Sequence, residues 1–378
     1  MVCTLLIEIS VGEVRAALLE DGEPVEFYME RLTSPSLTGS KFLARVQSIS
    51  KEMDAAFLDI GETKALLPAR RAGSNIKNSK LSTIAPEGCL IIVEIIREPD
   101  PRENKLAVAQ LIEGPGAKGA PGRIGEIPPP LEAILSIPAD QIIVDQPSFT
   151  EVRACHKKMR LVSALECASG EQTLFDRYGI HERVGEVLDG KLVLPSGGEI
   201  QVLETPAATF FDVDGAGAFK GSEASIAKLK INLEAADRIA AAIRFQNLGG
   251  LILIDFVGMN SKKHRDQVLE QLKSQLKRDP FRVECGIFSK FGLVEVRRER
   301  RGISLGRRLT SAQKKQLTIE SRVLGMLADA ERDAHHSPSA TIELHLSQDE
   351  LKWLDAHASL KTLWQQRTGK NLNPKGTK

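Results

Sequence analysis

The sequence predicts a mixed α/β protein into which a small β-barrel is inserted, and three observations support this prediction. Residues 209–259 have the pattern of a strand, a glycine-rich turn, a long amphipathic helix and a second strand. Residues 39–112 contain short strands separated by turn residues, which is typical of a small barrel. After the segment 114–130, short helices and strands alternate, as in α/β proteins.

The composition is that of an ordinary folded protein. The chain has 378 residues, of which 42% are hydrophobic and 27% charged, with a net charge of +1. A chain of this length can form several domains. Because the net charge is so small, a nucleic acid would have to bind to local basic patches. The clearest one, from Arg297 to Lys315, holds eight basic residues and one acidic residue. Such a run forms either a solvated face or a phosphate contact.

The cysteines and the N-terminal segment indicate a cytoplasmic protein. The five cysteines are scattered and never in a CxxC spacing, which fits a reducing compartment and argues against structural zinc. The segment MVCTLLIEISVGE lacks a basic n-region and contains Glu8, unlike a secretory signal. No apolar run approaches the roughly twenty residues of a membrane span.

The first part of the chain is predicted to be rich in strands. Residues 3–9 and 13–19 form a predicted hairpin around Gly12, and a third strand lies near residues 25–28. The predicted barrel strands are residues 42–49, 55–60, 65–68, 89–96 and 105–112.

Small barrels of this kind commonly bind single-stranded nucleic acid through aromatic and basic side chains. Phe57 is the candidate stacking residue, although a strand phenylalanine is often part of the core. The candidate phosphate contacts are Arg45, Arg97 and Lys105.

The segment 114–130 contains five glycines and five prolines, so we expect a linker or an exposed loop without regular structure. After it, we predict helices at residues 131–137, 148–160 and 172–188, strands at 141–144 and 162–165, and a hairpin at 192–200. The barrel is therefore expected to interrupt an α/β subdomain.

The central unit places acidic residues at the ends of two strands. Ser222 is a candidate N-cap for the long helix, which ends at two glycines before the strand 251–254. A strand, helix and strand of this length normally form a right-handed parallel unit, so Asp212 and Asp255 are expected at the same edge of the sheet. Strands lie about 4.8 Å apart, or twice that with one strand between them. Asp214, two residues after Asp212, points to the same side.

Three carboxylates at one edge suit a hard cation such as Mg²⁺ or Mn²⁺. The alternative is that each aspartate only caps a turn through hydrogen bonds to the backbone.

The last part of the chain is predicted to be mostly helical. We expect a helix marked by apolar residues between Val268 and Leu276 that ends at Asp279-Pro280, strands at 281–288, 293–297 and 341–346, and a charged helix over 309–333. Ser347 and Glu350 form a predicted capping box that opens a final helix reaching about Arg367. The ending GKNLNPKGTK is expected to be disordered.

Several of these segments together resemble a known family. LVLPSGGEI, FFDVDGAGAFKG, INLEAADRIAAAIRFQNLGGLILIDFVGM and SKFGLVEVRRER resemble the catalytic core of the ribonuclease E/G family, and ARVQSISKEMDAAFLDIGETKALLP resembles its S1 barrel. The resemblance spans residues 1–305 with one gap. It implies an RNase H-like subdomain (1–35 and 131–205), an S1/OB barrel (36–112), a linker (113–130), a DNase I-like catalytic subdomain (206–305) and a C-terminal helical extension (306–378).

The resemblance also implies an activity. Proteins of this family are magnesium-dependent endoribonucleases that cleave single-stranded, AU-rich RNA. It places Asp212 and Asp255 on the two metal-binding aspartates, and Asp214 where the family usually has asparagine. Lys220, in the glycine-rich turn beside the metal, is a candidate for stabilising phosphate charge or an ordinary surface lysine.

In the barrel, the resemblance places Phe57 and Lys105 on positions that contact RNA, while Leu66 replaces a second aromatic residue. The family's 5′-monophosphate sensor is missing, which implies cleavage independent of the 5′ end. Arg282 falls on an arginine of that sensor's phosphate pocket. The CxxC zinc link between protomers is also missing, so any homo-oligomer is expected to form without zinc.

Two other classes of function stay open from sequence alone. The chain fits a non-catalytic RNA-binding protein that keeps the ribonuclease fold. It also fits a phosphotransfer or nucleotide-binding protein, which ranks last because no GxxxxGK[ST] loop is present.

Overall fold

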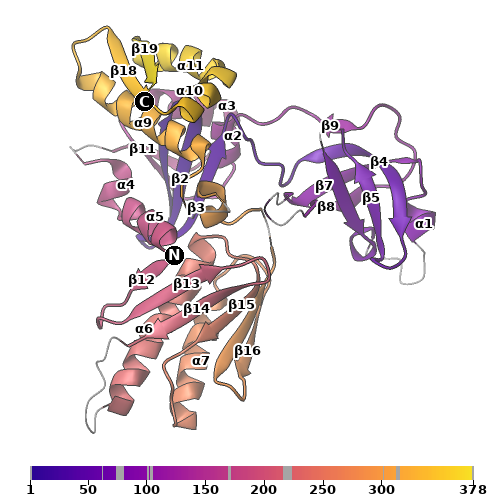
Figure 1. Cartoon of the computed structure of the whole chain (residues 1–378), viewed down its shortest axis with the longest axis vertical. Coiled ribbons are helices and arrows are strands. Elements are labelled where there is room, and N and C mark those ends of the chain that lie inside the picture. Colours follow the sequence, from indigo (N-terminus) through magenta and orange to yellow (C-terminus); the bar gives the residue numbers. More distant parts are fainter. Residues whose placement is uncertain are drawn as a thin grey trace. The chain divides into compact units, whose positions relative to one another are not determined.

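The computed structural model describes residues 2–61, 63–73, 81–99, 102, 105–168, 172–215, 224–300, 302–311 and 316–376. The chain divides into two compact units, shown in Figure 1. The first contains Met1–Ser34, Pro129–Glu299 and Ser304–Lys378, and the second contains Pro35–Pro128 and Arg300–Ile303. Within the described residues, no helix combines the length and the apolar character needed to cross a membrane.

The first unit contains a five-stranded sheet that joins the start of the chain to residues beyond the barrel. Its strands, in spatial order, are β11 (Ala164–Cys167), β10 (Gln141–Val144), β1 (Cys3–Ser10), β2 (Glu13–Glu20) and β3 (Glu23–Arg31). Strands β1, β2 and β3 are antiparallel, whereas β10 pairs in parallel with β1 and β11 in parallel with β10. The predicted strands of this region are therefore confirmed, except that the strand predicted over residues 162–165 is displaced by two residues to Ala164–Cys167.

Helices cover both faces of this sheet. The side chains of Leu5 and Ile7 pack with α2 (Pro130–Leu135) and α3 (Phe149–Met159). Leu6, between them, faces the other side with α4 (Leu174–Arg177) and α5 (Ile180–Asp189). This explains the continuous apolar run in β1. The single helix predicted over residues 172–188 is wrong, because Gly179 adopts a left-handed φ of 66° that interrupts it.

The second sheet of this unit carries the candidate acidic residues. Its strands are β12 (Lys191–Val193), β13 (Glu199–Glu204), β14 (Ala208–Asp214), β15 (Gly250–Asp255), β17 (Leu293–Arg298) and β16 (Val283–Phe288), in that spatial order. Helices α6 (Ala224–Phe245) and α7 (Lys262–Leu276) pack on one face (Figure 1). Alternate residues of the strands point to this core, as strand geometry requires.

The second unit is a closed β-barrel, consistent with an S1/OB-like domain. Its strands are β4 (Lys41–Ser50), β5 (Ala55–Asp59), β6 (Lys64–Pro68), β7 (Leu90–Arg97) and β8 (Ala107–Glu113), and it also has η1 (Ala69–Arg71) and α1 (Leu81–Ile84). The order β5-β6-β8-β7-β4 closes because β4 also pairs with β5.

The predicted barrel strands are confirmed within two residues at each end. The prediction that the Gly/Pro segment has no regular structure is wrong for β9 (Gly122–Ile124), which pairs with β4. The Arg123 side chain holds it there, donating a hydrogen bond to Ser40 Oγ (2.6 Å) and lying over the ring of Phe42.

The C-terminal part is more ordered than predicted. It comprises α8 (Leu305–Leu309), α9 (Ile319–His336), β18 (Thr341–Leu346), α10 (Gln348–Ala356), α11 (Ser359–Thr368) and β19 (Asn371–Gly376). The tail predicted to be disordered forms β19, which pairs in parallel with β18. The capping box of Ser347 and Glu350 is confirmed.

Two predicted helices of this part differ from the structure. The helix predicted over residues 309–333 is α9, which begins only at Ile319, because Thr310 and Leu317 form a β-bridge and Thr318 caps the helix. The last predicted helix breaks into α10 and α11, at the non-helical backbone of His357.

A buried ion-pair network joins the C-terminal part to the N-terminal sheet. The Arg31 guanidinium, fully buried, donates to Glu13 (2.6 Å), to Glu320 (3.0 Å) and to Ser321 (3.1 Å). Burial alone would raise the pKa of Glu13, but the charges of Arg15 and Arg31 outweigh it and lower that pKa. Removing one partner of such a buried network would leave an uncompensated charge.

Candidate functional site

Two aspartates lie side by side at the carboxyl edge of the second sheet. Strands β14 and β15 are direct parallel neighbours, and Asp212 and Asp255 are register partners. The residues before them, Phe211 and Ile254, are buried against the helices, so both aspartates project from the opposite, exposed face. Because neighbouring strands are about 4.8 Å apart, the two carboxylates are within reach of one ion. The predicted parallel pairing is confirmed, with no strand between them.

The charges of the two carboxylates interact. Partial burial raises the pKa of Asp255 above its ordinary value, and the negative charge of Asp212 raises it further. A bound cation would relieve this repulsion and stabilise both ionised forms. The donor set is therefore suited to a hard divalent ion such as Mg²⁺.

Asp214 lies two residues beyond Asp212 on the same exposed face, where it is the register partner of Glu199. In the part of the chain that the structure describes, no three acidic, histidine or cysteine side chains gather closely enough to hold a metal. Mg²⁺ commonly takes one or two carboxylates and fills its other positions with water and phosphate oxygens, so the pair is sufficient. The candidate Lys220 and the predicted N-cap Ser222 lie outside the described residues.

Asn232 holds the backbone that follows Asp255, and sequence reasoning missed it. This fully buried side chain of α6 donates to the carbonyl of Val257 (2.8 Å) and accepts from the N–H of Val257 (3.0 Å). Both backbone groups of Val257 are thus satisfied two residues after Asp255. The available signal was a polar residue between apolar positions of the predicted helix.

In the barrel, the structure aligns two of the candidate RNA-binding residues. Phe57, Leu66, Val108 and Arg97 are successive register partners across β5, β6, β8 and β7. Phe57 is half-buried and is not among the buried core residues of the barrel. Phe57 and Arg97 therefore belong to one row of side chains, with a leucine and a valine between them.

The other basic candidates occupy different places. Arg45 is exposed on β4 and donates to the carbonyl of Gly88 (3.2 Å). Lys105 is half-buried just before β8. Arg282 pairs with Glu284 (2.5 Å) at the start of β16. Val283, the first residue of β16, and Gly250, the first residue of β15, both pair with Arg298 of the intervening strand β17, so Arg282 lies at the end of the sheet opposite Asp255.

The basic stretch that begins at Arg297 is partly structural. Arg298 is buried, pairs with Asp279 (2.7 Å) and lies over the ring of Phe281. Arg307 pairs with Glu204 (2.7 Å). Because these two arginines form ion pairs within the fold, the number of basic residues in the stretch overestimates the positive charge that is available to bind phosphate.

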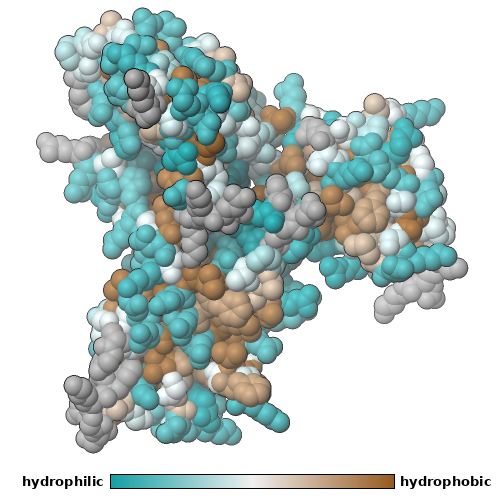
Figure 2. Space-filling model, viewed as in Figure 1, coloured by the Kyte–Doolittle hydropathy of each residue, from teal (hydrophilic) through white to brown (hydrophobic). Residues whose placement is uncertain are grey.

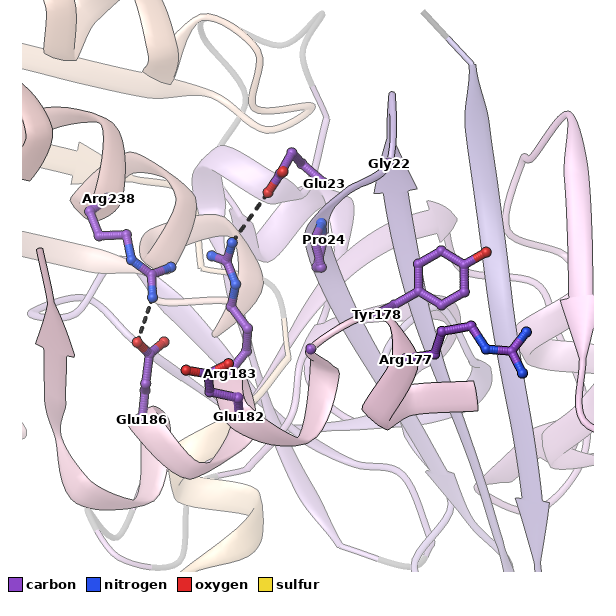
Figure 3. A pocket seen from close by; sticks show the side chains of 10 residues that line it. Gly22, Glu23, Pro24, Arg177, Tyr178, Glu182, Arg183, Glu186 and Arg238 are labelled. Atoms are coloured by element: carbon purple, nitrogen blue, oxygen red, sulfur yellow. Dashed lines mark hydrogen bonds and ion pairs between the residues drawn. The ribbon is translucent and has the colours of Figure 1, made fainter. Parts of the chain in front are cut away.

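A pocket of about 380 Å³ lies elsewhere in the first unit, and Figure 3 shows its lining. Its charged residues are Arg177, Arg183, Arg238, Glu23, Glu182 and Glu186. Dashed lines mark the ion pairs of Arg183 with Glu23 and of Arg238 with Glu186 (Figure 3). Its acidic and basic residues are equal in number, and neither Asp212 nor Asp255 contributes to it.

Comparison with known proteins agrees with the motifs. The model of the ribonuclease E/G family matches residues 130–301, which include both sheet-edge aspartates. Ribonuclease E of Escherichia coli (strain K12) is 34% identical over 170 residues, covering 44% of this chain and 16% of that protein. Ribonuclease G of the same strain is 37% identical over 141 residues, covering 37% of this chain and 29% of that protein.

A longer match extends over most of the chain. Ribonuclease G of Haemophilus influenzae is 25% identical over 399 residues, covering 80% of this chain and 80% of that protein. These matches support the resemblance of the chain to the ribonuclease E/G family. Its match to the E. coli ribonuclease E spans only about a sixth of that protein.

Proposed function

We propose that this protein is a magnesium-dependent endoribonuclease that cleaves single-stranded, AU-rich RNA in RNA processing or decay. The observation that carries the proposal is the register pair of Asp212 and Asp255 on an exposed sheet face. This pair lies inside the segment that matches the ribonuclease E/G family. Mn²⁺ fits the same oxygen ligands.

Asp212 and Asp255 would hold the metal. When bound, the ion supplies Lewis-acid activation of the scissile phosphodiester and of the attacking water. Asp214 would stand beside the pair, where its additional negative charge favours a cation and opposes the RNA backbone. Lys220 follows β14 in the sequence and lies outside the described residues; we propose that it neutralises phosphate charge.

The barrel would bind the RNA strand. Phe57 offers an aromatic surface on which an unpaired base stacks, and Arg97 in the same row offers a phosphate contact. Arg45 and Lys105 add positive charge to the same small domain. Because Leu66 lies beside Phe57, one stacking position is aliphatic.

The fold supports a finer assignment of the first unit. Its five-stranded sheet, with three antiparallel and two parallel strands, is consistent with an RNase H-like subdomain. The six-stranded sheet with α6 and α7 would be the DNase I-like catalytic subdomain. We further propose that cleavage is independent of the RNA 5′ end and that any oligomer forms without a zinc link.

The direct test compares Asp212→Asn and Asp255→Asn with wild type on a fluorescent AU-rich oligonucleotide in magnesium buffer. We expect the cleavage activity of each variant to fall by more than the roughly 10- to 100-fold that is typical when a residue hydrogen-bonded to a metal ligand is removed. Asp266→Asn is the matched control, because Asp266 is an exposed aspartate on α7, which covers the opposite face.

Asp214→Asn should retain cleavage, since it keeps the metal pair. Wild-type rates in both Asp212→Asn and Asp255→Asn would contradict the proposal. Tight RNA binding by the wild type without magnesium-dependent cleavage would instead indicate a non-catalytic RNA-binding protein.

A further inference from the structure

The exposed face of the second sheet carries apolar side chains in its interior strands. Leu203 of β13, Phe210 of β14 and Leu253 of β15 are successive register partners, and we call them the apolar row. Phe210 is 41% exposed and Leu203 is 48% exposed. Figure 2 shows apolar (brown) surface over these strands.

The apolar row lies directly next to the carboxylate pair. Phe210 precedes Asp212 by two residues on β14, and Leu253 precedes Asp255 by two residues on β15. Residues two apart on a strand share a face and are separated by about 7 Å. An exposed aromatic ring therefore stands one step from the position where the proposed metal would hold the scissile phosphate.

The chemistry of this face favours a nucleobase over a second protein copy. A two-fold contact through the face would bring the carboxylates of Asp212 and Asp255 toward like charges of the partner copy, which is unfavourable. An unpaired base has a neutral, flat π-surface that stacks on aromatic side chains, and its own phosphate can reach the adjacent carboxylate site.

We infer that Phe210 is a base-stacking platform for the nucleotide next to the scissile phosphate, with Leu203 and Leu253 flanking the base. The inference rests on the proposed function and adds a binding position that lies outside the barrel. It predicts that Phe210 acts on one nucleotide of the substrate and not on the strand as a whole.

The test combines a change in the protein with a change in the RNA. Wild type, Phe210→Ala, Phe210→Leu and Phe210→Tyr are assayed on an AU-rich oligonucleotide and on versions with one abasic site, placed in turn at each position around the cleavage site. In wild type, one abasic position should lower kcat/KM by about 5- to 150-fold, the range for loss of a stacked base.

In Phe210→Ala and Phe210→Leu, the same abasic site should cause little further loss, because the stacking partner is already missing. Phe210→Tyr should behave like wild type, since it keeps the aromatic ring. Val162→Ala is the control, because Val162 is fully exposed in a loop outside this sheet.

If the abasic site lowers kcat/KM equally in wild type and Phe210→Ala, the inference is overturned. If Asp212→Asn at the same time loses cleavage, the proposed function still stands. If the wild type does not cleave, the proposed function fails, and the same comparison by fluorescence anisotropy of bound RNA decides whether Phe210 stacks. Sedimentation velocity measures the oligomeric state of Phe210→Ala. If that state changes while the abasic penalty stays equal to that of wild type, the face serves protein association and the inference is overturned.

Discussion

Asp145 is a carboxylate in an unfavourable environment. It follows β10, and its Oδ1 atom is buried without a hydrogen-bond partner among the described residues. Burial raises the pKa of Asp145 to about 6, a hydrogen bond from Ser148 partly opposes the shift, and the charge of Glu8 adds to it. Burial also raises the pKa of Glu8 on β1. At neutral pH the folded chain therefore holds a charge that burial disfavours.

Replacing Asp145 by asparagine should stabilise the protein at neutral pH. The pKa of Asp145 in the folded protein lies above its ordinary value. The protonated Asp145 carboxyl therefore contributes its full stabilisation below about pH 4, and this contribution is lost as the pH rises through about 6. We expect Asp145→Asn to gain up to about 2–3 kcal/mol near pH 8 and much less near pH 4.

Chemical denaturation of both proteins at the two pH values measures this difference. Asp266→Asn, which removes an exposed aspartate, controls for the change in net charge. A gain that does not depend on pH would show that ionisation of Asp145 is not the cause.

At the scale of a single element, α6 does more than cover the sheet. The hydrogen bonds of Asn232 fix the segment after β15, whose last residue is Asp255. We expect Asn232→Ala to lower the free energy of unfolding by about 1–3 kcal/mol, because it leaves partly buried backbone groups of Val257 without their hydrogen bonds. Cleavage should also fall, since Asp255 would be held less firmly.

Denaturation and cleavage assays on Asn232→Ala test this role against Lys230→Ala. Lys230 is an exposed residue of the same helix, and its replacement should change the free energy of unfolding by less than about 0.5 kcal/mol. Equal stability of the two variants would contradict a role for Asn232 in fixing β15.

The elements differ in how well the sequence predicted them, and the reason is the range of the interactions that form them. The Asp212 and Asp255 edge was predictable because local periodicity gives the strands and handedness gives their parallel pairing. Strand β19 was missed because its polar residues are ordered only by pairing with β18, about thirty residues earlier. Asn232 was missed for the same reason, since its partner Val257 lies outside α6, in the segment after β15.

At the scale of the whole molecule, the described residues form a closed barrel and sheets of five, six and two strands. The proposal that cleavage is independent of the RNA 5′ end is tested at this scale. We predict equal kcat/KM for oligonucleotides with a 5′-monophosphate and with a 5′-hydroxyl group. Arg282→Ala should leave that ratio unchanged, because Arg282 lies at the far end of the sheet from Asp255 and is paired with Glu284. Faster cleavage of the monophosphorylated RNA would contradict the prediction.

The most direct test of the central claim is a measurement of metal binding that does not depend on cleavage. Mn²⁺ binding to wild type, Asp212→Asn, Asp255→Asn and Asp266→Asn can be followed by electron paramagnetic resonance. We predict that wild type and Asp266→Asn bind the ion at one site and that this binding is lost in both other variants. Unchanged Mn²⁺ binding in Asp212→Asn and Asp255→Asn would show that this pair of carboxylates is not the metal site.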